Sequence, residues 1–232
     1  MAEKRCYLCK GEADTKDHVP PKGLFPEPRP SNLITVDCCY RCNQKFTKID
    51  EEFRLFVSAP INRSPEGRRI WEQKVLRSTL PSRRIAKAIR KITHRQTFLA
   101  TESGPIPAVR IEVRQRPIKL CLIRITKGLL ATFHPDLDYS DLEFRVTPFD
   151  QFKLAKTVAT MPELLVYDER GGSVFRFWRG IATDQTNAGL WFFCFFNAAA
   201  FMVEHRIRGG FASRDVKKSA KKRRGLASQP ES

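Results

Sequence analysis

The spacing of apolar residues predicts strand, loop, strand and helix, in that order, near the N-terminus. Residues 15–19 can form a strand that ends at two prolines, and residues 33–36 are a second short β-rich run. From about residue 40 to residue 57 the apolar side chains recur at steps of three and four, which is the period of an amphipathic helix. That helix would bury Phe46, Ile49, Phe53 and Phe56.

The rest of the chain mixes both kinds of spacing, and the fold class that this predicts is α+β. We expect strands at residues 109–113 and 142–146, a helix at about 148–160, and a hairpin over residues 164–181. Residues 117–131 are ambiguous, because Pro117 favours a helix start while β-branched side chains favour a strand. The longest apolar run, residues 188–203, is shorter than the roughly 20 residues that cross a bilayer. It predicts a buried strand followed by a second short element.

Half of the excess positive charge lies in one segment. Residues 61–95 carry eleven Lys and Arg but two Glu, and so hold +9 of the chain's net charge of +17. Helices are expected here at about 68–79 and 82–93, the second with isoleucines on one face. Its basic side chains, expected to bind nucleic acid, are Arg83, Arg84, Lys87, Arg90 and Lys91. Solvated helix faces usually mix both signs of charge, so this surface favours a phosphate backbone over the alternative of a plain solvated face.

These patterns divide the chain into four parts. Residues 1–60 form an N-terminal module, 61–95 a basic helical segment, 96–212 an α+β domain that begins with a linker at 101–107, and 213–232 a disordered basic tail. The role of residues 96–212 is open between target recognition, formation of a homodimer and binding of a protein partner. The N-terminus has no apolar run, so we expect no signal peptide, no membrane partner and a cytoplasmic location.

Cysteine spacing predicts a metal site in a reducing compartment. Five of the seven cysteines lie within the first 42 residues, and four of them form the pairs Cys6-x2-Cys9 and Cys39-x2-Cys42. Each pair places two thiolates on one tight turn, and two such pairs match the four tetrahedral ligands of a structural Zn(II). Cys38 is a rival ligand, and Cys39 is preferred because it restores the spacing with Cys42. A redox dithiol is the weaker alternative, since it does not need two pairs.

Further motif residues lie between and beside these cysteine pairs. Asp17-His18 precedes a proline pair, Asn32-Leu33 precedes the second strand, and Asn43 directly follows Cys42. In this order the residues resemble the HNH endonuclease family, the ββα-metal nucleases, over about residues 4–56. The resemblance implies a ββα-metal fold for the N-terminal module and an enzyme that hydrolyses phosphodiester bonds of DNA.

The resemblance also implies a role for each motif residue. His18 would be the general base for water, which suits an imidazole that titrates near neutral pH. Asp17 and Asn43 would hold a catalytic Mg(II) or Mn(II), separate from the structural Zn(II). Asn32 would tie back the loop so that His18 is aimed at its target.

The partner expected from the charge is nucleic acid, with DNA preferred over RNA. Two other functions stay open. One is a non-catalytic, zinc-dependent nucleic-acid-binding protein that keeps the motif residues as scaffold. The other is an RNA-directed nuclease, because basic helices that contact phosphates do not distinguish the two sugars.

Overall fold

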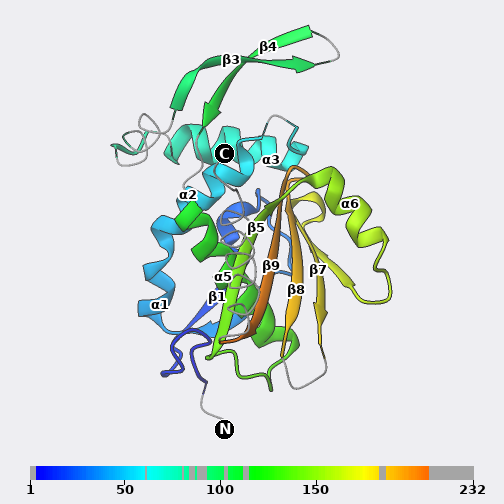
Figure 1. The fold of residues 1–232 in the computed structure, drawn as a ribbon. Helices are drawn as coiled ribbons and strands as arrows, with labels where there is room; N and C mark the ends of the chain where they lie inside the picture. The colour runs from blue at the N-terminus through cyan, green and yellow to red at the C-terminus, as the bar shows by residue number, and fades with distance from the viewer. Residues whose placement is uncertain are drawn as a thin grey trace, which may run out of the picture.

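The computed structural model describes residues 4–60, 62–79, 81–83, 87, 93–101, 104–111, 115–182 and 187–208. Within them, helices and antiparallel sheets combine into the expected α+β fold. Figure 1 shows an N-terminal unit of short strands and helices packed through one long helix, α5, against a larger sheet. None of the helices in these ranges is both long and apolar enough to cross a membrane.

The N-terminal unit contains the predicted strand, loop, strand and helix. Strands β1 (Thr15–Val19) and β2 (Ile34–Cys38) pair antiparallel, with His18 opposite Thr35. The loop between them includes the short helix η1 (Lys22–Leu24). The predicted helix is present in two parts, α1 (Tyr40–Lys45) and α2 (Thr47–Ser58), which meet at Phe46.

Helix α5 (Gln115–Phe133) resolves the ambiguous segment in favour of a helix. Pro117 lies in its first turn, where a missing N–H is tolerated, and both β-branched and unbranched apolar side chains are buried along it. The helix packs against β1, β2 and α2 of the N-terminal unit and against β5 and β9 of the larger sheet. Tertiary burial therefore outweighs the strand preference of its isoleucines.

The larger sheet has five antiparallel strands in the order β5-β9-β8-β7-β6. Their bounds are β5 (Leu142–Phe149), β6 (Val166–Arg170), β7 (Phe175–Ile181), β8 (Gly189–Phe195) and β9 (Ala199–Ile207), with α6 (Gln151–Ala159) after β5 and η3 (Gly172–Val174) before β7. The predicted hairpin is confirmed: its turn passes through Gly171 and Gly172 at φ values of 65° and 58°, which glycine adopts without strain. The long apolar run forms β8 and the start of β9.

One hydrophobic core joins the N-terminal unit to the larger sheet. Phe53 of α2 packs edge-on against Phe195 of β8, with ring centroids 5.1 Å apart. Gly128 of α5 lies so close to β1 that an added Cβ would be 2.5 Å from a methyl group of Val19. The boundary expected at residue 60 therefore does not separate two cores.

Two expectations for the middle of the chain need correction. The linker at 101–107 is wrong, because β3 (Thr93–Thr101) and β4 (Gly104–Ile111) pair antiparallel with Thr101 opposite Gly104. This hairpin projects from the rest of the molecule in Figure 1. The helix expected at 68–79 begins earlier, as α3 (Pro65–Ile70), and continues as the π-helix η2 (Trp71–Thr79).

Candidate functional site

Four cysteine thiols converge at the base of the N-terminal unit. The Sγ atoms of Cys6, Cys9, Cys39 and Cys42 all lie within 4.8 Å of one another, and the Cys9 and Cys39 sulfurs are 3.7 Å apart. With Zn–S bonds of about 2.3 Å, the edge of a tetrahedral site is about 3.8 Å, so the spacing fits a structural metal such as zinc. The two predicted pairs therefore form one group, called here the four-cysteine cluster.

The structure assembles this cluster with Cys39 and not with Cys38. Cys39 caps the N-terminus of α1, where its sulfur accepts a hydrogen bond from the backbone N–H of Cys42 at 3.4 Å. Cys38 is the last residue of β2, is fully buried, and faces Cys6 at an Sγ–Sγ distance of 3.9 Å. Burial raises the pKa of Cys38 and so keeps it a neutral thiol. For Cys6, burial is outweighed by backbone N–H groups, mainly that of Cys39, which lower its pKa to about 6 and favour the thiolate.

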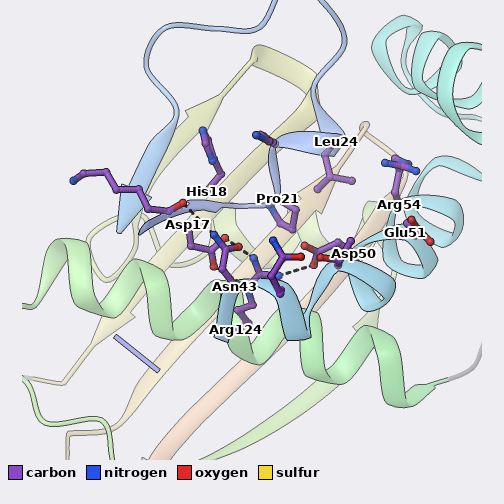
Figure 2. A pocket seen from close by; sticks show the side chains of 14 residues that line it. Asp17, His18, Pro21, Leu24, Asn43, Asp50, Glu51, Arg54 and Arg124 are labelled. Carbon is purple, nitrogen blue, oxygen red and sulfur yellow. Dashed lines mark hydrogen bonds and ion pairs between the residues drawn. The ribbon is translucent and has the colours of Figure 1, made fainter. Parts of the chain in front are cut away.

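A pocket of about 350 Å³ opens beside β1, on the face of the unit that carries the motif residues. Asp17, His18 and Asn43 all line it, so three of the four expected catalytic residues share one cavity (Figure 2). The remaining lining includes the cationic side chains Lys16, Lys22, Arg54 and Arg124 and the acidic side chains Asp50 and Glu51. Asn32 is exposed in the turn before β2 and is not among the residues that line the pocket.

Within this pocket His18 is half-buried and projects from the side of β1 opposite to Asp17 (Figure 2). The alternation of side chains along a strand causes this separation. Burial lowers the pKa of the His18 imidazole below its ordinary value. The positive charge of Lys22 lowers this pKa further and outweighs the opposite effect of Asp17, and Arg29 adds a smaller lowering. The imidazole is therefore neutral at neutral pH, which is the form that accepts a proton.

Asp17 is buried, with 3% of its surface exposed, and its carboxylate is fully engaged by the protein. Arg124 of α5 donates from Nη2 to one oxygen at 2.5 Å and from Nε to the other at 2.8 Å, and the Tyr7 hydroxyl donates to that second oxygen at 2.6 Å. A divalent cation would have to displace these donors and lie beside a guanidinium. The arrangement therefore does not fit the expected role of Asp17 as a metal ligand.

Arg124 also reaches the helix that follows the motif. Its Nη1 donates to Asp50 of α2 at 2.6 Å, and its guanidinium lies 4.7 Å from the centre of the Phe46 ring. Burial raises the pKa of Asp50 to about 6, although Arg124 opposes this shift. Sequence reasoning did not identify Arg124 or Asp50 as site residues; the available signal was one arginine in the middle of an otherwise apolar helical run, LCLIRITKGLL.

Asn43 holds α1 against β1. Its Nδ2 donates to the backbone oxygen of Lys16 at 3.3 Å, and Thr15 Oγ1 is 3.5 Å away. Among the described residues, no second group of three His, Cys or acidic ligands is close enough to bind a metal by itself. The pocket therefore brings the motif residues together without a ready-made site for a divalent cation.

The basic segment is described only in part. Arg83 and Lys87 are helical and exposed, as expected for a surface that contacts phosphates. Arg84, Arg90 and Lys91 lie outside the described residues. The proposed nucleic-acid-binding surface of this segment therefore stays a prediction.

No protein-family model matches this chain, and no curated protein or solved structure matches it. The resemblance to HNH endonucleases therefore rests on the motif residues themselves. What the structure adds is their arrangement: a β-hairpin and a helix joined by the four-cysteine cluster, with His18 and Asn43 at one pocket.

Proposed function

We propose that this chain is an HNH-type endonuclease that hydrolyses phosphodiester bonds of DNA and is stabilised by a structural zinc. The observation that carries the proposal is the shared pocket of His18 and Asn43 beside the four-cysteine cluster. A closed four-thiolate zinc contributes stability and catalyses nothing itself, so the chemistry is assigned to the pocket.

His18 acts as the general base. It accepts a proton from the attacking water, and the lowered pKa keeps the imidazole in the accepting form at neutral pH. A positioned base of this kind contributes typically about 10²- to 10⁴-fold to the rate.

Cationic side chains around the pocket provide the attraction for the phosphate. Lys16, Lys22 and Arg54 line it, and Arg29 is close enough to His18 to lower its pKa. Lys74 contacts the loop between β1 and β2, where its Nζ donates a hydrogen bond to the backbone oxygen of Phe25 at 3.0 Å. Contacts to phosphate position the nucleic acid and carry no base sequence, so sequence preference has to come from elsewhere in the chain.

The resemblance implies a catalytic Mg(II) or Mn(II), which would neutralise charge that develops on the phosphate. Of the two expected ligands, Asn43 lines the pocket, whereas the carboxylate of Asp17 accepts hydrogen bonds from Arg124 and Tyr7. Because the donor set does not fit, no step is assigned here to a divalent cation.

A non-catalytic nucleic-acid-binding protein is the second candidate. It is favoured by one observation, the engagement of both Asp17 oxygens by Arg124. Both candidates predict binding of nucleic acid, but only the nuclease predicts hydrolysis of DNA.

Incubation of the zinc-loaded protein with labelled duplex DNA and RNA of equal length, with and without Mg(II) or Mn(II), tests both. The nuclease proposal predicts cleaved DNA. Tight, salt-sensitive binding with intact DNA under every condition would support the binding protein instead, and cleavage confined to RNA would reassign the substrate.

A further inference from the structure

A positive charge of the protein itself lies among the acidic side chains of the pocket. Figure 2 shows Asp17, Asn43 and Asp50 gathered around the guanidinium of Arg124. The side chains of Arg124 and Asp17 are each 4% exposed, and that of Asp50 is 23% exposed. Two carboxylates from different elements, β1 and α2, are thus bridged by one residue of α5.

The guanidinium is held on several sides, so it is not easily displaced. Three of its five N–H donor positions are used by the two carboxylates, and its face lies against Phe46. Bidentate pairing of this kind is the strongest geometry available to arginine and carboxylate. A divalent cation that bound Asp17 would have to break this pairing inside the protein.

The same helix clamps β1 on both sides of His18. Asp17, directly before His18, is bound by Arg124, and Val19, directly after it, packs against Gly128. Arg124 and Gly128 are four residues apart and therefore share one face of α5. With both neighbours fixed to α5, His18 projects from the opposite side of the strand, where it is one of the residues that line the pocket.

We infer that Arg124 is the resident cation of this site, and that Asp17 is a positioning residue that fixes the strand of His18 and does not coordinate a divalent cation. Only the role given to His18 rests on the proposed function. The binding of a metal ion by these residues is measured without any substrate.

The test is a titration of the full-length, zinc-loaded protein with Mn(II) alone, followed by the electron paramagnetic resonance signal of the free ion. Asp17→Asn is compared with Asp37→Asn, which removes a half-exposed carboxylate from the neighbouring strand. If Asp17 is not a ligand, both variants change the Mn(II) affinity by less than twofold. A tenfold weakening in Asp17→Asn, with Asp37→Asn unchanged, would overturn the inference.

Variants of Arg124 test the same inference from the other side. Arg124→Met frees two carboxylates and should raise the Mn(II) affinity at least tenfold, while Arg124→Lys keeps a cation in place and should stay near wild type. Equal Mn(II) affinities in the wild type, Arg124→Met and Arg124→Lys would contradict the role of Arg124. Asp17→Asn and Arg124→Met each break the same buried ion pair, so zinc content and circular dichroism first show which of them is folded under the titration conditions. If only one is folded, its comparison with the wild type decides.

The outcome separates the inference from the proposed function. Mn(II) held by Asp17 overturns the role of Arg124 and leaves the nuclease proposal standing. An unchanged Mn(II) affinity in Asp17→Asn, together with intact DNA in every cleavage reaction, supports the role of Arg124 and overturns the nuclease proposal.

Discussion

Arg124 of α5 donates hydrogen bonds to both carboxylate oxygens of Asp17 on β1, although 107 positions separate the two residues in the chain. This ion pair connects the N-terminal unit to α5, the helix that packs against β5 and β9 of the larger sheet. Both side chains are almost completely buried, so removal of one leaves the other charged and without its main partner.

We therefore expect Asp17→Asn and Arg124→Met each to lower the free energy of unfolding by about 3–5 kcal/mol, the usual cost of breaking a buried ion pair. The double variant should cost clearly less than the sum of the two, because Asp17 and Arg124 no longer leave each other unpaired, and only Asp50 still loses its partner. Urea unfolding measures all three proteins.

The matched control is Asp37→Asn, whose partner Lys16 is 57% exposed, and it should cost no more than about 1 kcal/mol. Additive effects of Asp17→Asn and Arg124→Met would show that the two side chains do not interact in solution.

Zinc binding should depend on Cys39 and not on its neighbour. Cys39→Ala removes one corner of the four-cysteine cluster, so the purified protein should lose its zinc and much of its thermal stability. Cys38→Ala removes a buried thiol outside that cluster and should retain one zinc per chain, with a moderate loss of stability. Elemental analysis of both variants measures the metal content. Zinc retained in Cys39→Ala and lost in Cys38→Ala would reverse the assignment.

The pH dependence of cleavage should follow the imidazole of His18. Because a neutral imidazole is required and its pKa is lowered, the single-turnover rate should be on its plateau at pH 7 and fall as the pH drops through a value below 6.5. Lys22→Gln removes one of the charges that lower this pKa, so the midpoint should move upward in that variant. A rate that keeps rising between pH 7 and 8, with the same midpoint in Lys22→Gln, would argue against His18 as the base.

The basic segment should contribute to binding of nucleic acid and not to folding. Replacement of Arg84, Lys87 and Lys91 by Gln should reduce the slope of log affinity against log salt by about 2–3 units, since each lost phosphate contact removes nearly one unit. Circular dichroism should remain unchanged. Fluorescence anisotropy with a labelled duplex at several salt concentrations gives the slope, and an unchanged slope would mean that this helix does not face the DNA.

Local sequence patterns were sufficient for the elements around the four-cysteine cluster. The spacing of the cysteines, the proline pair after His18 and the three- and four-residue repeat through Phe53 depend on neighbours in the chain, and β1, β2, α1 and α2 follow from them. The break at Phe46 was missed, because it does not interrupt the apolar pattern of a continuous helix. Of the hairpin formed by β3 and β4, only the end of β4 was predicted, as part of the strand expected at 109–113.

The environment of the candidate site depends on long-range contacts, and a sequence pattern does not contain them. An aspartate at position 17 is a residue type that can bind a metal ion, but its partner in the structure is Arg124. Arg124 lies in residues 117–131, whose sequence fits a helix or a strand equally well. Only the packing of α5 against β1 brings the two together, through contacts such as that between Gly128 and Val19. A buried arginine in an apolar run is the one local sign that an acidic partner lies nearby.

The catalytic role of His18 is measured directly by the single-turnover rate of DNA cleavage by the zinc-loaded His18→Ala protein. His134→Ala, which removes a partly buried imidazole directly after α5 that is not among the residues lining the pocket, is the control. We expect a loss of about 10²- to 10⁴-fold in His18→Ala, with zinc content and DNA affinity unchanged, and little change in His134→Ala. Equal rates for His18→Ala and the wild type would contradict the role of His18 as the general base.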